Sequence, residues 1–346
     1  MKTVAVVGGG VIGLSVAWRL AARGCAVTVY DPDPGSGASH VAAGMLAPVG
    51  EAYFGETELV ALMRESARRW PAFAAELTEQ AGLDVGYRTD GTLLVARTDD
   101  DLAELNRLVR WQASLGLTPQ PLRASELRER EPRLVPRLRG GAFVADDRQV
   151  DPRLVVRALR SLVRVEARAV TDLSTVDGDV VVVAAGCASA ALAGLPVRPV
   201  KGQLVRLRGP VALRAVIRGY LDGRTVYLVP RADGEVVVGA TSEERLDGAV
   251  TAGAVLDLLR SAVELVPDLA EYELTETQAG FRPGTPDNAP IIGALRPGLV
   301  VATGHYRNGV LLAPVTADAV ADLVTGGPDA DLVKPFGPDR FGGRTG

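Results

Sequence analysis

Histidine and cysteine are both scarce in this chain of 346 residues, which contains only two of each. Zinc sites and Cys–His nucleophile pairs are built from these residue types, so we expect no metal site and no catalysis by such a pair. We expect Cys25 and Cys187 to be buried thiols without a chemical role. Any chemistry must therefore come largely from a bound cofactor.

Long apolar runs and clusters of positive charge are also lacking. No run approaches the ~18 apolar residues that span a bilayer, and three glycines and Arg19 interrupt the first apolar stretch, which leaves no room for a signal peptide. The 38 Lys and Arg are scattered and are outnumbered by 42 Asp and Glu, giving a net charge of −4. The sequence predicts a cytoplasmic protein of about two domains with a small ligand and no nucleic-acid or membrane partner.

Glycine, in contrast, is abundant, and it forms a dinucleotide fingerprint near the start of the chain. Gly8-Gly-Gly-Val-Ile-Gly13 follows a strand-like run at 3–7 and opens a helical pattern at 11–23 that stops at Gly24. Gly8 suits the tight turn, Gly10 the close approach of a pyrophosphate, and Gly13 the packing of helix on sheet, with the helix N-terminus facing the phosphates.

An acidic residue completes this fingerprint. A second strand at 26–30 ends in Asp31, 18 residues past Gly13, which is close to the spacing at which an acid takes the ribose hydroxyls. The alternative is an ordinary glycine-rich turn followed by a chance acid. The complete strand–turn–helix–strand context favours the dinucleotide site.

Further elements follow from periodicity and capping. We expect helices at 56–81, interrupted at Pro71, and at 99–115, 252–265 and up to about 324. Asp151 and Pro152 are typical of an N-cap and first helical position, for a helix to about 163. Strands are expected at 163–170, 179–185 and 299–303, the second being the apolar run of a central parallel strand. The glycine-rich tail at 337–346 is expected to fray.

From residue 201 the pattern changes to alternation. Runs at 204–208, 226–229 and 235–239, with a hairpin turn at 232–234, predict an antiparallel sheet. The chain then returns to a strand and a helix of the first type. The nucleotide domain is therefore expected to be discontinuous.

Seven motifs together carry a resemblance that covers nearly the whole chain. They are Gly8 to Gly13, Ser39-x-x-Ala42-Ala-Gly-Met-Leu-Ala-Pro48, Lys201-Gly-Gln203, Tyr227-Leu-Val-Pro-Arg231, Gly239-Ala-Thr241, Gly280-Phe-Arg-Pro-Gly-Thr-Pro-Asp287 and Gly304-His-Tyr-Arg-Asn-Gly309. In these motifs the chain resembles the FAD-dependent D-amino-acid oxidase superfamily, and within it the glycine oxidase branch associated with thiamine biosynthesis.

The resemblance implies an α/β fold with two domains. A Rossmann-like FAD-binding domain would comprise residues 1–85, 140–200 and 272–346, and an antiparallel-sheet substrate domain residues 86–139 and 201–271. The flavin ring would lie at the interface between them. We also expect a homo-oligomer, whose size the sequence does not set.

The same resemblance maps FAD contacts onto this sequence. They are Gly8, Gly10, Val11, Ile12 and Gly13 at the phosphates, Tyr30 and Asp31 at the ribose, Ala38, Ser39, Ala43, Gly44 and Met45 towards and along the ring, Val170 near the adenine, Gly186, and the loop His305, Tyr306, Arg307, Asn308, Gly309, Val310 and Leu311. A flavin that accepts hydride becomes negative near N1 and C2, where residues 307–311, entering the last helix, would offer N–H groups. The alternative is an ordinary helix-entry turn at Asn308-Gly309.

Three residues are the expected catalytic group. In the family, the residue that matches Arg282 anchors the substrate carboxylate, and the one that matches Arg307 lies near the same end; a planar guanidinium fork suits that role. Tyr227 could give its hydroxyl to the carboxylate or close the pocket. The alternatives are a solvated loop arginine and an aromatic residue that only packs across the sheet. The family oxidises a neutral amine without a protein base, so His305 is assigned to the flavin loop.

The substrate stays open at this point. Thr225 and Ser242 stand near the expected pocket where some glycine oxidases carry His and Met, so the pocket could be larger. Candidates are glycine, sarcosine, another N-alkylglycine or a small D-amino acid, giving glyoxylate and ammonia or methylamine from the first two. The acceptor is O₂ in an oxidase, with peroxide as product, or another acceptor in a dehydrogenase; a non-enzymatic flavoprotein is the third possibility. No cysteine follows Cys187, so FAD should be non-covalent.

Overall fold

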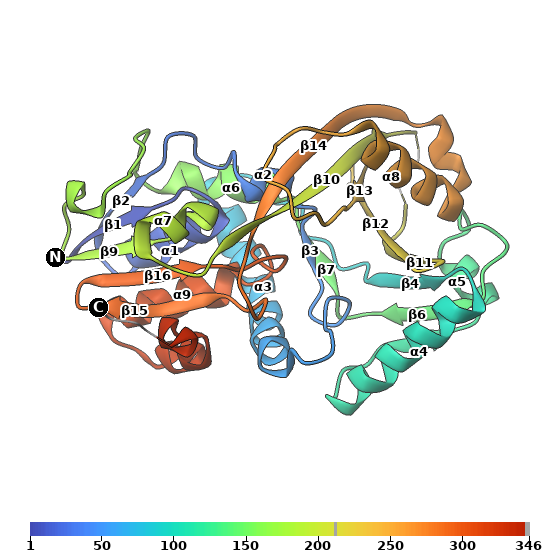
Figure 1. The fold of residues 1–346 in the computed structure, drawn as a ribbon, viewed down its shortest axis with the longest axis horizontal. Coiled ribbons are helices and arrows are strands. Elements are labelled where there is room, and N and C mark those ends of the chain that lie inside the picture. Colours follow the sequence, from blue (N-terminus) through green and yellow to red (C-terminus); the bar gives the residue numbers. More distant parts are fainter. Residues whose placement is uncertain (211–212, 343–346) are drawn as a thin grey trace.

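The computed structural model describes residues 1–210 and 213–342, which form two lobes, each built around one large sheet (Figure 1). One sheet has the strand order β15-β16-β9-β1-β2-β8 and the other β14-β10-β13-β12-β11-β4-β6-β5. The first sheet contains β1 (Thr3–Val7), β2 (Ala26–Tyr30), β8 (Val165–Glu166), β9 (Val180–Val183), β15 (Ile291–Arg296) and β16 (Leu299–Thr303). The second contains β4 (Thr92–Ala96), β5 (Gln120–Leu122), β6 (Gly140–Val144), β10 (Arg198–Arg208), β11 (Val216–Leu221), β12 (Arg224–Pro230), β13 (Glu235–Gly239) and β14 (Glu273–Gly284).

The first sheet is the predicted dinucleotide sheet. Strand β1 pairs in parallel with β2 and β9, and β9 pairs in parallel with β16, so the apolar run at 180–183 is central, as predicted. The predicted strand at 163–170 is wrong in length, because β8 has only two residues. The N–H of Arg168 turns back to the carbonyl of Glu166 at 2.8 Å, which ends this edge strand.

Helices cover the first sheet. They are α1 (Val11–Ala22), α3 (Thr57–Ala81), α6 (Pro152–Leu162), α7 (Ser189–Ala193) and α9 (Ala313–Thr325), with the short α2 (Ala38–Val41) at the junction of the lobes (Figure 1). The predicted interruption of α3 at Pro71 is wrong. Trp70 and Phe73 are buried on either side of the exposed Pro71, so core packing keeps the helix continuous despite the lost hydrogen bond.

The second sheet is antiparallel except at one pair. The predicted runs lie in β10, β12 and β13, which pair antiparallel as predicted, with β12 and β13 forming the hairpin. Strands β11 and β4, which were not predicted, pair in parallel. Helix α8 (Ala252–Leu265) has the predicted bounds, and α4 (Asp99–Ser114) and α5 (Ala124–Arg130) also belong to this lobe (Figure 1). A small ribbon of β3 (Met45–Leu46) and β7 (Arg148–Gln149) lies between the lobes.

Two strands predicted to belong to the FAD-binding domain pair with strands of the substrate domain. Strand β14 pairs with β10 and β6 pairs with β4, so residues 273–284 and 140–144 hydrogen-bond within the second sheet although the sequence places them in the FAD-binding domain. The long strands β10 and β14 thus run from one lobe into the other (Figure 1). The domain boundaries themselves stay a prediction.

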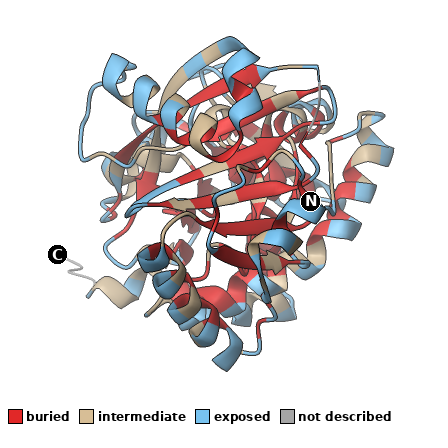
Figure 2. Ribbon diagram, turned by 90° about the vertical axis from the view of Figure 1, so that its right-hand side faces the viewer, coloured by how far each residue is buried: buried red, intermediate tan, exposed pale blue. Residues whose placement is uncertain are grey.

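One core fills the first lobe and extends to β4, α4 and β6 of the second, and another lies between the second sheet and α8. Buried residues follow the strands and the inner faces of the helices (Figure 2). Among the described residues, no helix is both long enough and apolar enough to cross a membrane. Cys25 and Cys187 are free thiols that are only partly buried, so the expectation of buried thiols holds in part.

The C-terminal segment is more ordered than expected. Residues 338–341 form a short 3₁₀ turn, and the Arg340 Nε donates to Asp287 Oδ2 at 2.8 Å. The prediction of fraying is therefore wrong for residues 337–342, because this ion pair fastens the segment to the loop after β14. Residues 343–346 lie outside the described part of the chain.

Candidate active site

Three of the four glycines of the first motif, Gly8, Gly10 and Gly13, have different surroundings. Gly8 has a φ of 113°, and a Cβ there would overlap the carbonyl of Ala184, while a Cβ on Gly13 would overlap the carbonyl of Gly8. The protein's own packing therefore requires glycine at both positions. At Gly10 the nearest atom to an added Cβ is the Ser39 Oγ, at 3.3 Å. Among the described residues only this one atom lies within 4 Å of the added Cβ, so the space in front of Gly10 is less crowded than that at Gly8 or Gly13.

The N-terminus of α1 opens into this space. Gly10 is its N-cap, and within the described residues the helix has no side-chain cap and no acid in its first turn. The Ser39 Oγ accepts a hydrogen bond from the Val11 N–H at 2.9 Å. A helix N-terminus with such space in front of it and no acid in its first turn fits a pyrophosphate.

Asp31 lies beside this turn at the end of β2. Its carboxylate accepts from the N–H of Gly9 at 2.7 Å and from that of Asp33 at 2.8 Å, which fixes it next to the phosphate space. Val170 and Tyr30 both pack against the Ala5–Val7 side of the sheet. The structure therefore brings the predicted phosphate, ribose and adenine residues to one edge, although no contact with a nucleotide tests their roles.

The predicted flavin segment at 43–45 is tied to both lobes. Gly44 has a φ of 82° and Met45 pairs with Gln149 of β7. From the second sheet, the buried Arg231 donates to the carbonyl of Ala43 at 2.6 Å. The prediction did not include Arg231 among the site residues, although it ends one of the quoted motifs.

Gly304 to Leu311 form the turn that leads into α9, which begins at Ala313. His305 is buried, its Nε2 lies 3.0 Å from Thr316 Oγ1, and burial lowers its pKa to about 3, so the ring is neutral. The Tyr306 N–H donates to the carbonyl of Pro283 at 3.0 Å, which joins this turn to the strand that carries Arg282.

Three further hydrogen bonds hold the neighbouring backbone in place. The carbonyl of Leu311 accepts from Ser66 Oγ and Trp70 Nε1 of α3, at 2.7 and 2.8 Å. The carbonyl of Gly186 accepts from Thr303 Oγ1 at 3.1 Å. The ends of β9 and β16 and the turn at 304–311 are therefore held together at one edge of the first sheet. We call this edge, where the predicted FAD contacts lie, the cofactor edge.

Arg282 and Tyr227 meet on one face of the second sheet. The Arg282 guanidinium lies over Gly202, where any Cβ would overlap it, and its Nη1 donates to the carbonyl of Thr241 at 3.1 Å. The Tyr227 hydroxyl lies over Gly239 in the same way. Burial raises the pKa of Tyr227, and the Arg282 guanidinium, which hydrogen-bonds to the phenol, opposes the rise.

Arg307 reaches the same region through a buried acid that the prediction did not include. Its Nε lies 3.8 Å from Glu51 Oε2, and the other oxygen of Glu51 pairs with Arg218 of β11. Arg218 stands directly opposite Tyr227 in the sheet. Burial alone would raise the pKa of Glu51, but Arg218 and Arg307 outweigh it and hold that pKa below its ordinary value.

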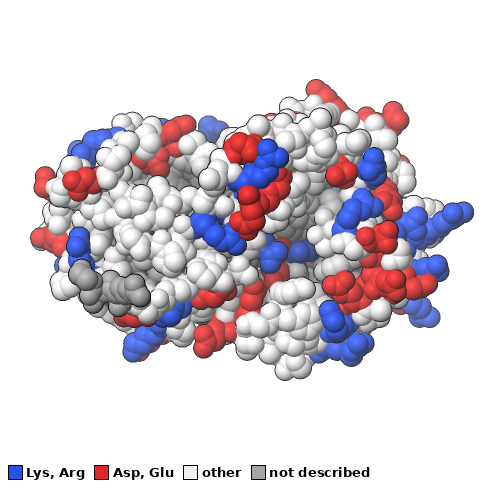
Figure 3. Space-filling model, in the orientation of Figure 1, with Lys and Arg blue, Asp and Glu red and all other residues white. Residues whose placement is uncertain are grey.

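The two missed residues left weak signals in the sequence. Glu51 follows the small-residue motif at 42–48, and Arg218 is the one charged residue of the strand Val216–Leu221. In the space-filling view, the surface is hollowed between the two lobes and basic atoms lie in the hollow (Figure 3).

Asp147 is fully buried, and its carboxylate lies against the backbone of Val49 and Gly50, just before Glu51 in the chain. Burial raises the pKa of its carboxyl to about 7, against an ordinary 3.8, although the N–H groups of Val49 and Gly50 donate to its Oδ1 at 3.3 and 3.4 Å. The folded state therefore holds this proton more tightly than the unfolded chain does. The tighter binding of this proton stabilises the folded protein. This stabilisation is complete below about pH 4 and is lost as the pH rises through 7.

Replacing Asp147 by Asn removes this titration while keeping the shape of the side chain. We expect the unfolding free energy of Asp147→Asn, relative to the unaltered protein, to increase from pH 5 to pH 7, by at most about 1.4 kcal/mol per pH unit. Urea unfolding at both pH values measures it, with the exposed Asp257→Asn as control. A difference that does not change with pH would contradict the assignment.

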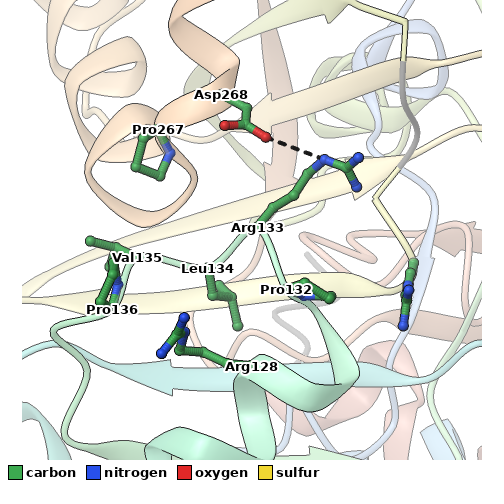
Figure 4. A pocket seen from close by; sticks show the side chains of 9 residues that line it. Arg128, Pro132, Arg133, Leu134, Val135, Pro136, Pro267 and Asp268 are labelled. Carbon is green, nitrogen blue, oxygen red and sulfur yellow. Dashed lines mark ion pairs between the residues drawn. The ribbon is translucent and has the colours of Figure 1, made fainter.

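A separate surface pocket of about 400 Å³ lies elsewhere on the second lobe. Its lining includes Arg128, Arg133, Arg214 and Asp268, with Arg133 Nε 3.4 Å from Asp268 Oδ2 (Figure 4). None of the predicted site residues lines it. Within the described residues, no group of three or more His, Cys, Asp or Glu could hold a metal ion.

A glycine turn at a helix N-terminus in the first lobe and an arginine–tyrosine pair on the second sheet are typical of a dinucleotide-binding protein with a site for a small anion. The family described as FAD-dependent oxidoreductase (DAO) matches residues 3–323. The chain belongs to this family, and FAD is its cofactor, as predicted. The glycine turn and the space before it fit this cofactor.

The chain is similar to several known members. It is 36% identical to the glycine oxidase of Geobacillus kaustophilus over 99% of this chain and 98% of that protein, whose crystal structure superposes with a TM-score of 0.90. It is 33% identical to a bifunctional ThiO/ThiG protein of Trichormus variabilis, covering 98% of this chain but only 55% of that protein. Iminodiacetate oxidase from Chelativorans sp. BNC1 is 27% identical, covers 97% and 98% of the two chains, and gives a TM-score of 0.86.

These matches confirm the predicted family and fold class, and the predicted enzyme class of FAD-dependent amino-acid oxidase. The roles given to individual residues stay predictions.

Proposed function

We propose that this protein oxidises glycine or a small N-alkylglycine such as sarcosine, with O₂ as electron acceptor. Bound FAD would supply the redox chemistry, as acceptor of a hydride from the substrate Cα and donor of both electrons to O₂, with hydrogen peroxide as the product. The resulting imine is hydrolysed by water to glyoxylate and ammonia or methylamine. The observation that carries the proposal is the Arg282–Tyr227 pair, which sits on the sheet face that also holds Arg218.

The residues of this face would bind and orient the substrate. The Arg282 guanidinium contacts the carbonyl of Thr241 and the Tyr227 hydroxyl and has no carboxylate partner among the described residues, so its fork can take a substrate carboxylate in a bidentate pair. Tyr227 would donate its hydroxyl to the same carboxylate, and Arg307 would lie near that end. The neutral, buried His305 is turned to Thr316 and holds the loop rather than moving a substrate proton.

A larger substrate is the second candidate. Thr225 precedes Tyr227 by two residues and so lies on the same face of β12, and both Thr225 and Ser242 are exposed. This side of the face is therefore open, which favours a small D-amino acid as the alternative. A dehydrogenase that uses another acceptor remains the alternative to O₂.

Peroxide formation distinguishes the acceptors. We expect the purified protein to release peroxide in air, removable by catalase, when given glycine or sarcosine. Coupled peroxidase detection measures it, and heat-inactivated protein is the control. Turnover with an artificial acceptor but no peroxide in air would instead favour the dehydrogenase.

Three further parts of the proposal have simple tests. We expect acid to release intact FAD into solution, as non-covalent binding requires; colour that stays with the precipitate would contradict this.

A role in thiamine biosynthesis, supported by the likeness to ThiO/ThiG, predicts growth without thiamine when the chain is expressed in a strain that lacks its own glycine oxidase. A cytoplasmic homo-oligomer is checked by cell fractionation and light scattering.

A further inference from the structure

We propose that Glu51 is a specificity-determining residue: its carboxylate fills an anion site between Arg218 and Arg307 and so excludes substrates that carry a second acidic group. The inference rests on the proposed function, because it concerns the same pocket. It assigns a role to an acid that the proposed reaction does not use.

The geometry of Glu51 is that of a bound carboxylate. One oxygen pairs with Arg218 Nη1 and the other lies 3.8 Å from Arg307 Nε, so the group bridges two guanidinium groups from different lobes. Its side chain is only 11% exposed, against 17% for Arg218 and 42% for Arg307. A buried acid that joins two arginines occupies the place where a ligand carboxylate would otherwise bind.

The remaining arginine is left for the substrate. Arg282 has no carboxylate partner among the described residues, and its contacts are Thr241 and Tyr227. One substrate carboxylate therefore finds a free guanidinium. A second substrate carboxylate would meet the negative charge of Glu51, because Arg218 and Arg307 are already paired with it. Repulsion between like charges discriminates between ligands in this way.

Two other acids face this cluster and do not replace Glu51. Glu56 lies near Arg307 but accepts from the Asn288 side-chain amide at 3.2 Å, and burial raises its pKa. Asp147 is turned to the backbone of Val49 and Gly50. Iminodiacetate oxidase has the same fold and is named for a diacid, so the restriction must lie in local residues rather than in the architecture.

Binding of acetate and malonate, which carry one and two carboxylates, tests the inference without turnover. Each is titrated into the FAD-loaded protein and followed by the flavin absorbance spectrum. In Glu51→Gln we expect the Kd for malonate to fall by roughly 10- to 100-fold, with a much smaller change for acetate, because two unpaired guanidinium groups become available. The melting temperature of this variant should also rise with malonate.

Two further variants make the result specific. Glu51→Gln combined with Arg218→Met removes both charges of the pair, and the gain in malonate affinity should disappear. Glu76→Gln, which removes the acid of the Arg19–Glu76 pair (2.6 Å) between α1 and α3, should leave both affinities unchanged. Equal changes for acetate and malonate in Glu51→Gln would overturn the inference.

The unaltered protein supplies a test that needs no variant. It should bind acetate at least about ten-fold more tightly than malonate; equal or tighter malonate binding overturns the inference even if Glu51→Gln does not fold.

Measuring turnover separates the failure of this inference from the failure of the proposed function. If no amine reduces the flavin but Glu51→Gln gains malonate binding, the proposed function fails while the anion site stands; if sarcosine is oxidised but malonate binding does not change, the reverse holds.

Discussion

Replacing Arg282 by Ala is expected to lower kcat/KM for the amino-acid substrate by about 30-fold to several thousand-fold, because a substrate as small as glycine has only a carboxylate and an amine to bind. Arg282→Lys should recover little, since an ammonium lacks the planar fork. Steady-state kinetics with glycine and sarcosine measure both. FAD content and the oxidised flavin spectrum should stay the same, because the guanidinium lies over Gly202 and Tyr227 of the substrate face.

Two companion variants sharpen this result. Gly202→Ala would place a Cβ in the space of the Arg282 guanidinium, so it should mimic the loss of Arg282 in part while leaving the arginine present. Arg208→Ala, at the outer end of the same strand β10 and paired with Asp233, is the matched control and should leave kcat/KM unchanged. If Arg282→Ala kept an unaltered KM, or simply lost FAD, Arg282 would not be the carboxylate anchor.

Replacing Gly10 by Val should yield largely FAD-free protein that still folds. The nearest atom to an added Cβ is Ser39 Oγ at 3.3 Å, so a side chain extends into the space in front of the α1 N-terminus, where the pyrophosphate would lie, rather than into the core. The ratio of absorbance at 450 and 280 nm measures FAD content, and circular dichroism checks the fold.

The control for this prediction is another glycine with free space. Gly248→Val changes a glycine with no atom within 4 Å of its added Cβ, outside the cofactor edge, and should keep full FAD content. A Gly10→Val protein that purified with as much FAD as the control would remove Gly10 from the cofactor site.

The elements that could be predicted from the sequence are those with local signals. The β1–α1–β2 unit, α8 and β16 were expected at the observed positions, because glycine punctuation and hydrophobic periodicity act over a few residues. Strands β11 and β14 were not expected. Arg218 interrupts the apolar character of β11, and β14 begins with polar residues whose strand state depends on its partner β10.

The site shows the same distinction. Arg282, Tyr227 and Arg307 were predicted from motifs. Glu51 and Arg218 were not, because their pairing joins positions 51, 218 and 307, which only the folded chain brings together. The uninterrupted α3 has a related cause. The burial of Trp70 and Phe73 is a property of the whole core, and it overrides the local signal of Pro71.

Anaerobic reduction of the bound flavin tests the central claim most directly, because it reports hydride transfer from the substrate and is independent of the acceptor. The FAD-loaded protein is mixed without oxygen with glycine, sarcosine and a panel of small D-amino acids, and the absorbance at 450 nm is followed. The account predicts that glycine or sarcosine bleaches the flavin fastest and that Arg282→Ala slows this bleaching severely. No bleaching by any of these amines, or equal bleaching in Arg282→Ala, would contradict it.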